Sequence, residues 1–189
     1  MSDRFQNKYR IESAQLKHWD YGKNAMYFLT IYTQNREYFF GDVVYGNMVL
    51  NNVGEIANDC RLEIPTHFPF VKLKNHVVMP NHIHGIVMID KPDDGRFDGR
   101  NVETQNFASL QPYQPDSNTK NQFGPQSKNL ASIVRGFKIG VTKNARLINP
   151  DFAWQTRFHD HIIRNDESFH RISEYIINNP GNWSKDQFS

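Results

Sequence analysis

Two histidines one residue apart, His82 and His84, are the residues in this sequence whose types and spacing point most directly to chemistry. They follow a Pro-Asn turn and open an apolar stretch typical of a β-strand, in the run Met79-Pro80-Asn81-His82-Ile83-His84-Gly85. Side chains two residues apart on a strand leave the same face of the sheet, so both imidazoles face one side while Ile83 enters the core. Two imidazoles on one face supply half of the coordination sphere of a divalent metal ion. The pattern also fits ordinary strand histidines, one hydrogen-bonded and one exposed.

A second candidate lies near the C-terminal end, where Tyr175 and Asn179 are four residues apart in a segment with helical features. Residues four apart share one face of a helix. A tyrosine hydroxyl beside an amide oxygen supplies a nucleophile and a third metal ligand. The alternative is a tyrosine ring that packs in the core and an asparagine that caps the C-terminus of the helix.

His159 and His161 form a second His-x-His pair on a predicted strand and are a rival metal site. No nucleophile is their neighbour in the sequence. Contacts with substrate, or structural contacts, are therefore the favoured interpretation of this pair.

The elements that must position these residues follow from residue type and periodicity. Aromatic and β-branched runs predict strands, apolar residues at helical spacing predict helices, and Pro65 is expected to stop the first helix. We expect strands over 25–33, 70–79, 82–89 and about 156–163, with helices over about 52–64, 129–147 and 166–178. This βαββαβ order predicts an α+β, ferredoxin-like antiparallel sheet with helices on one face, plus a C-terminal helix that carries Tyr175.

Residues 91–127 differ in composition from the rest of the chain. They are rich in Asp, Asn, Gln, Gly, Pro and Ser and show no apolar periodicity, so we expect a mobile surface insertion in a single domain that spans residues 1–189. Tyr113 and Phe123 lie in this insertion; a role in base stacking is the less favoured interpretation of these rings.

Composition excludes several classes of protein. The formal net charge of +2 rules out a histone-like polycation but leaves room for a local basic face. The single cysteine, Cys60, cannot form an intramolecular disulfide. The N-terminus lacks the apolar core of a signal peptide, and no apolar run reaches the ~18 residues of a membrane span. We therefore expect a soluble, cytoplasmic protein that has no membrane partner.

Two segments resemble one known family. The run Val77–Gly85 looks like the HUH motif (histidine, bulky hydrophobe, histidine) of the single-strand tyrosine transposases, and Tyr175–Pro180 looks like their nucleophile helix. The basic segment 128–146 and the run Arg157–Arg164 are also similar to this family, particularly to its REP-associated branch. Insertion-sequence members usually place Gln four residues after the tyrosine, whereas Asn179 stands here and is similar to the REP-associated branch. The resemblance covers residues from about 26 to 183.

The resemblance implies a mechanism. His82, His84 and Asn179 would hold Mg²⁺ or Mn²⁺, and Tyr175 would attack the scissile phosphate to leave a covalent 5′-phosphotyrosine and a free 3′-hydroxyl. The expected function is a metal-dependent endonuclease and strand transferase that cleaves and rejoins single-stranded or hairpin DNA, which places the protein at the nucleoid. The alternative is a non-catalytic nucleic-acid-binding or regulatory protein derived from a transposase. Monomer and homodimer both remain open.

Basic residues around the helix over 129–147 are the expected DNA contacts. Five basic side chains and no acidic ones lie between residues 128 and 146, which favours salt-dependent binding of phosphates over a merely solvated helix face. With the arginine of the run Arg157–Arg164, the predicted DNA-binding set is Lys128, Arg135, Lys138, Lys143, Arg146 and Arg157.

Overall fold

A four-stranded antiparallel sheet lies at the centre of the residues that the computed structural model describes, which are 19–92 and 128–185. Its strands are β1 (Ala25–Tyr32), β4 (Val71–Met79), β5 (His82–Ile89) and β6 (His159–Ile163), in the order β4-β5-β1-β6. β1 lies between β5 and β6 and pairs antiparallel with both. With helices between β1 and β4 and between β5 and β6, this is the ferredoxin-like order that the sequence predicts.

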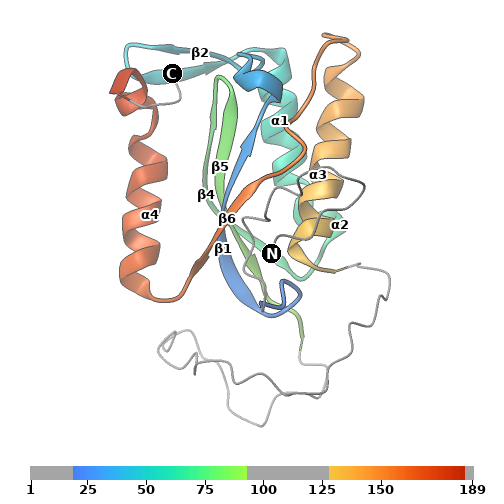
Figure 1. Cartoon of the computed structure of the whole chain (residues 1–189), viewed down its shortest axis with the longest axis vertical. Coiled ribbons are helices and arrows are strands. Elements are labelled where there is room, and N and C mark those ends of the chain that lie inside the picture. Colours follow the sequence, from blue (N-terminus) through green and yellow to red (C-terminus); the bar gives the residue numbers. More distant parts are fainter. Residues whose placement is uncertain (1–18, 93–127, 186–189) are drawn as a thin grey trace, which may run out of the picture.

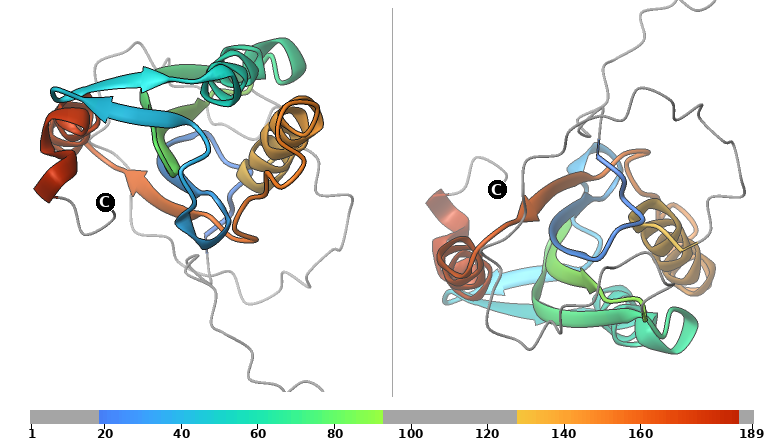
Figure 2. Two further views of the ribbon diagram at one scale, coloured as in Figure 1. Left: turned by 90° about the horizontal axis from the view of Figure 1, so that it is seen from above. Right: turned by 90° about the horizontal axis from the view of Figure 1, so that it is seen from below.

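Helices lie on both faces of this sheet. The helices α1 (Asn52–Leu62) and α3 (Leu130–Ala145) pack on one face, and α4 (Asp166–Asn178) packs on the other (Figure 1 and Figure 2). Each of the three begins at an asparagine whose side chain accepts backbone N–H groups of the first turn, and these caps are Asn51, Asn129 and Asn165. Such caps satisfy donors that a helix start leaves open, so the helix starts are set locally.

Two hydrophobic clusters correspond to the two faces. The larger lies between the sheet and the helices α1 and α3, and it contains Ile83, whose side chain points away from the neighbouring histidines as predicted. The ring of Trp154 packs against this cluster. The smaller cluster joins the sheet to α4 through Met26, Ile86, Ile163, Ile172 and Ile176. This second cluster is what holds the C-terminal helix against the histidine side of β5.

Pro65 does not stop the helical conformation, contrary to the sequence prediction. The helix α1 ends at Leu62, and a short helix α2 (Ile64–His67) follows with Pro65 in its first turn. A proline at that position loses no hydrogen bond, since the first N–H groups of a helix have no intrahelical acceptor.

A two-stranded hairpin, β2 (Gly41–Val44) and β3 (Asn47–Leu50), was missing from the predicted order. Its strands are only four residues long, and the turn places Tyr45 and Gly46 at φ values of 51° and 75°. A turn with two left-handed residues is usually marked by Asn-Gly or Asp-Gly, and tyrosine at the first position gave no such signal. The last strand is also shorter than predicted: β6 begins at His159, although a strand was expected from about residue 156.

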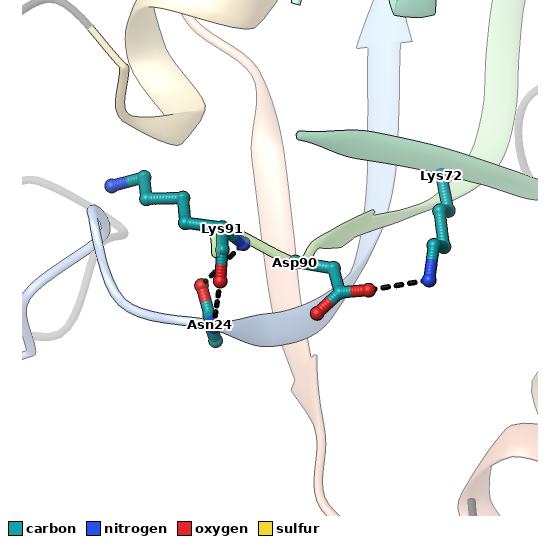
Figure 3. A network of polar contacts seen from close by, with 4 residues as sticks. All are labelled: Asn24, Lys72, Asp90 and Lys91. Atoms are coloured by element: carbon teal, nitrogen blue, oxygen red, sulfur yellow. Dashed lines mark hydrogen bonds and ion pairs between the residues drawn. The ribbon is translucent and has the colours of Figure 1, made fainter. Parts of the chain in front are cut away.

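The flanks of the segment 93–127 are held by one loop. The side chain of Asn24 bonds both backbone groups of Lys91 (2.9 and 3.0 Å), next to an ion pair between Lys72 and Asp90 (Figure 3). On the far side of the segment, the backbone N–H of Leu130 bonds the carbonyl of Tyr21 at 3.0 Å. Lys91, the first residue of the predicted insertion, is therefore anchored, and residues 93–127 with Tyr113 and Phe123 lie outside the described residues.

Gly85, which follows the histidine pair, is required by a close approach of Arg61. A Cβ atom at Gly85 would lie 3.0 Å from both Nε and Nη2 of Arg61. The Arg61 side chain is buried, and Nη2 donates to the carbonyls of Lys74 and Ile86, each at 3.2 Å, so it cannot withdraw cheaply. We expect Gly85→Ala to lower the free energy of unfolding by about 1–3 kcal/mol in urea denaturation.

Gly140→Ala is the matched control for this prediction. A Cβ at Gly140 meets Cys60 Sγ at an ordinary 3.6 Å, and alanine is the better helix former, so stability should stay equal or rise. Equal stability of the Gly85 and Gly140 variants would contradict the role given to Arg61.

Candidate active site

His82 and His84 lie side by side on β5 and face α4. Their side chains are buried, at 0% and 2% exposure, and their Nε2 atoms are 3.0 Å apart. The register of the sheet places His82 opposite Tyr32 and His84 opposite Thr30 on β1. The prediction that both imidazoles share one face is confirmed in geometry.

Each histidine is oriented through its other ring nitrogen. Nδ1 of His82 donates to Oδ1 of Asn81 at 2.7 Å, since a carbonyl oxygen can only accept. Nδ1 of His84 lies 2.9 Å from Oγ1 of Thr30, a hydroxyl that can accept as well as donate. These contacts let both Nε2 atoms carry a lone pair, and the partners fix the ring orientations as is usual for metal-binding histidines.

Burial keeps this pair uncharged at neutral pH. Loss of solvation lowers the pKa of His84 from 6.5 to about 4. The pKa of His82 is lowered further, by burial first and then by the nearby charges of His84 and Arg36. Neutral imidazole is the form that binds metal ions, so protons do not compete for the two Nε2 atoms near pH 7.

The helix α4 brings Tyr175 to the histidines across 91 residues of sequence: its hydroxyl oxygen is 3.3 Å from Nε2 of His84. The ring is 43% exposed and meets the edges of Phe28 and His84, with centroids 6.1 and 5.2 Å away. The alternative of a tyrosine packed in the core is therefore wrong. The hydroxyl reaches the histidine pair while the side chain stays open to solvent.

Asn179 lies one helical turn beyond Tyr175 at the C-cap position of α4. Its side chain is 2% exposed, and among the described residues its Oδ1 atom has no hydrogen-bond partner. A buried amide oxygen without a donor is costly and rare. Asn179 therefore occupies the C-terminal cap position that the alternative interpretation predicts. Its side-chain oxygen, however, is available to bind another group.

These observations fit a divalent metal ion. Two lone pairs that face each other at 3.0 Å repel unless a proton or a cation lies between or beside them. Two ligand atoms bound at about 2.1 Å and about 90° apart on one ion are about 3.0 Å from each other, which equals the spacing of the histidines. The buried oxygen of Asn179 is a donor of the kind that Mg²⁺ and Mn²⁺ accept. Within the described ranges no cluster of three His, Cys, Asp or Glu side chains exists, so a site here depends on the amide.

Several residues around the histidines were not found from the sequence. The ring of Tyr32 is 5.3 Å from that of His82, the ring of Trp183 is 5.9 Å from His82, and Arg36 Cζ lies 5.2 Å from the centre of the Tyr32 ring. For Trp183, only its position just past the helix that carries Tyr175 could have indicated the site, and Arg36 gave no signal of its own.

His159 and His161, the rival pair, lie exposed on β6. The register places them opposite Thr30 and Phe28, so they share the face of the candidate metal histidines. The ring of His159 is 5.9 Å from that of Tyr32. Their exposure at an edge strand favours contact with a substrate, as the sequence interpretation expects.

The predicted DNA-binding residues gather on the other side of the sheet. Lys128 precedes α3, three of the set lie within it, and Arg146 is its C-cap. A surface groove beside α3 is lined by Arg135, Lys138, Lys143 and Arg146, together with apolar residues such as Phe158. The helix α3 packs on the face of the sheet opposite α4 (Figure 2), whereas the histidines face α4. The structure thus does not bring the four groove residues to the candidate active site.

Two of these basic side chains also have structural contacts. Nζ of Lys138 donates to the carbonyls of Gln155 and Arg157, and burial lowers its pKa to about 8. Nε of Arg146 donates to the carbonyl of Phe152 at 3.0 Å. The role of the whole set in DNA binding stays a prediction.

Comparison with known proteins points to one family. A Haemophilus influenzae protein of uncharacterised function is 39% identical over 176 residues, which cover 93% of this chain and 91% of that protein. The chain belongs to the same family as this protein. No protein-family model matches the sequence. Within the described residues, no helix is long and apolar enough to cross a bilayer.

Two further similarities of this chain are to REP-associated tyrosine transposases. A second Haemophilus influenzae protein, named as a candidate REP-associated tyrosine transposase, is 26% identical over 161 residues, or 85% of this chain and 73% of that protein. The solved structure of a REP-associated tyrosine transposase bound to a REP hairpin shares the fold, with a TM-score of 0.57 and 18% identity over 92% of this chain and 76% of that one. The resemblance to REP-associated tyrosine transposases that the sequence predicts is confirmed.

Proposed function

We propose that this protein is a metal-dependent endonuclease and strand transferase that cleaves and rejoins single-stranded or hairpin DNA through a covalent bond to Tyr175. The observation that carries the proposal is the 3.3 Å contact between the Tyr175 hydroxyl and Nε2 of His84. This contact places a candidate nucleophile, near the C-terminal end of the sequence, beside a buried histidine pair that would bind the metal ion. The solved relative that shares the fold is bound to a REP hairpin, which supports hairpin DNA as the substrate class.

The chemistry balances without a cofactor that carries energy. The Tyr175 hydroxyl loses its proton and its oxygen attacks phosphorus, so that a new O–P bond forms. The bond from phosphorus to the 3′-oxygen breaks, and that oxygen takes up a proton, which leaves a 5′-phosphotyrosine and a free 3′-hydroxyl. A later attack by a 3′-hydroxyl on the phosphotyrosine restores a phosphodiester and releases the tyrosine. Since the phosphotyrosine is itself a phosphodiester, strands can be rejoined without ATP.

His82, His84 and Asn179 are the residues that would hold Mg²⁺ or Mn²⁺. Such an ion supplies positive charge next to the scissile phosphate. The protein's own contribution is orientation: Asn81 and Thr30 hold the two imidazoles, and the cluster around Ile172 and Ile176 holds α4 so that the Tyr175 hydroxyl stays beside them. The exposed ring of Tyr175 lets a DNA strand approach from solvent.

A covalent adduct tests the proposal. Labelled hairpins with single-stranded flanks, incubated with the protein and Mn²⁺, are expected to give a protein–DNA band that survives a denaturing gel and is absent in EDTA. A protein that binds a range of such hairpins but never forms the band would instead be the non-catalytic binding or regulatory protein named as the alternative.

A further inference from the structure

We propose that Arg36 and His159 form a phosphate-binding subsite beside the histidine pair, which holds the single strand that flanks the scissile phosphate. This inference rests on the proposed function, because it names where the flanking strand of that reaction lies. Neither residue belongs to the predicted DNA-binding set.

The ring of Tyr32 places the two side chains next to the candidate metal site. Its centroid is 5.3 Å from the ring of His82 on one side and 5.9 Å from the ring of His159 on the other. Arg36 Cζ lies 5.2 Å from the same centroid. Successive phosphates of a stacked strand are about 3.4 Å apart along its axis. A strand whose scissile phosphate lies at His82 and His84 therefore brings one of its next phosphates to this ring.

The side chains of Arg36 and His159 are exposed to solvent, whereas the ring of Tyr32, which contacts both, is 6% exposed. The helix α4 packs mainly over β4 and β5, and it reaches β1 and β6 through Met26, Phe28 and Ile163. Tyr32 and His159 lie at the other ends of β1 and β6. A strand that leaves the histidine pair across β1 passes over His159 on the edge strand.

The backbone around Arg36 is built to hold the guanidinium at this position. Asn35 and Arg36 have φ values of 52° and 58°, which is unusual for two successive residues other than glycine. The segment is anchored to the turn that precedes His82: the backbone N–H and hydroxyl of Thr33 both donate to the carbonyl of Asn81, each at 2.9 Å. Strained backbone that surrounding contacts maintain is characteristic of functional positions.

The chemistry of the two side chains suits a phosphodiester. A guanidinium offers a planar fork of donors that matches two phosphate oxygens, and it stacks on a tyrosine ring without loss of those donors. The exposed imidazole of His159, which also contacts the Tyr32 ring, adds a further donor. The basic groove of α3 lies on the other face of the sheet and cannot serve a strand at this position.

A double-mutant cycle between protein and DNA tests this assignment. The protein carries Tyr175→Phe throughout, so that only binding is measured, and the probe is a labelled hairpin selected from a randomised pool for binding to that protein. Each phosphate of the single-stranded flank is replaced in turn by an uncharged methylphosphonate. Arg36→Gln and His159→Gln are compared with Lys74→Gln, which removes an exposed charge from β4, and thermal melting checks that each variant is folded.

We expect Arg36→Gln to weaken binding about tenfold, His159→Gln to weaken it less, and Lys74→Gln to leave it unchanged. At one or two flank positions, the methylphosphonate should weaken binding by the protein that retains Arg36. At the same positions it should not weaken binding by the Arg36→Gln protein any further. The slope of log K against log salt should fall by about 0.7 for the lost contact. Additive effects at every position, or coupling only at a phosphate inside the duplex, would overturn the subsite. Coupling at the flank with no covalent adduct from the wild-type protein would keep the subsite and reject the proposed reaction.

Discussion

Replacing Tyr175 with phenylalanine is expected to abolish the covalent protein–DNA adduct, with a loss of at least about 10³-fold, while hairpin binding stays within about twofold. The change removes only the hydroxyl that lies 3.3 Å from Nε2 of His84. The ring keeps its edge contacts with Phe28 and His84, so the position of α4 should not change. Adduct on a denaturing gel and binding by fluorescence anisotropy measure the two effects separately.

Tyr45→Phe is the matched control. Tyr45 is 99% exposed at the tip of the β2–β3 hairpin, and the change likewise removes one tyrosine hydroxyl. Its adduct yield should equal that of the wild-type protein. An adduct that persists in the Tyr175 variant would mean that another side chain is the nucleophile, and the proposed mechanism would then be wrong.

Changing His82 or His84 to alanine is expected to weaken metal binding and to lower the adduct yield by about 10²-fold or more. The readout that does not depend on catalysis is the effect of metal on stability. A metal ion at 100 times its dissociation constant stabilises a folded protein by about 2.7 kcal/mol, so Mn²⁺ should raise the Tm of the wild-type protein and not that of either variant. The exposed His67, at the end of α2, provides the control His67→Ala.

The Asn179→Ala variant distinguishes a role of Asn179 in metal binding from a role in the stability of the fold. Its Oδ1 atom is buried and has no partner among the described residues, so its removal should cost little stability in EDTA. In Mn²⁺ the same variant should lose much of the metal-induced rise in Tm. A large loss of stability in EDTA together with an unchanged response to Mn²⁺ would indicate that Asn179 is a structural cap and that the third ligand lies elsewhere.

Local physics explains why so much of the fold could be predicted. The period of two along a strand put His82 and His84 on one face and Ile83 on the other without knowledge of any partner strand. The last helix was predicted at its observed bounds, since Asp166 and Glu167 favour its first turn and Pro180 follows its end. The β2–β3 hairpin was not predicted because its turn lacks the usual residues. The prediction that Pro65 stops a helix was wrong because a proline suits the first turn of a following helix as well as the end of a preceding one.

For the candidate site, too, features set within one element could be predicted, and features set by tertiary packing could not. By itself the sequence determined the residue types, the shared face of the histidines, and the separation of Tyr175 and Asn179 by one helical turn, because each depends on spacing within one element. Only the tertiary structure decided that α4 packs on the histidine face, which brings Tyr175 to His84, and that α3 packs on the opposite face. β5 is buried on both faces, and each face carries large apolar side chains, so its sequence does not tell which helix covers which side. The position of Arg36 likewise depends on a left-handed backbone and on a contact with the Pro80–Asn81 turn, far along the chain, and spacing within one element cannot reveal such contacts.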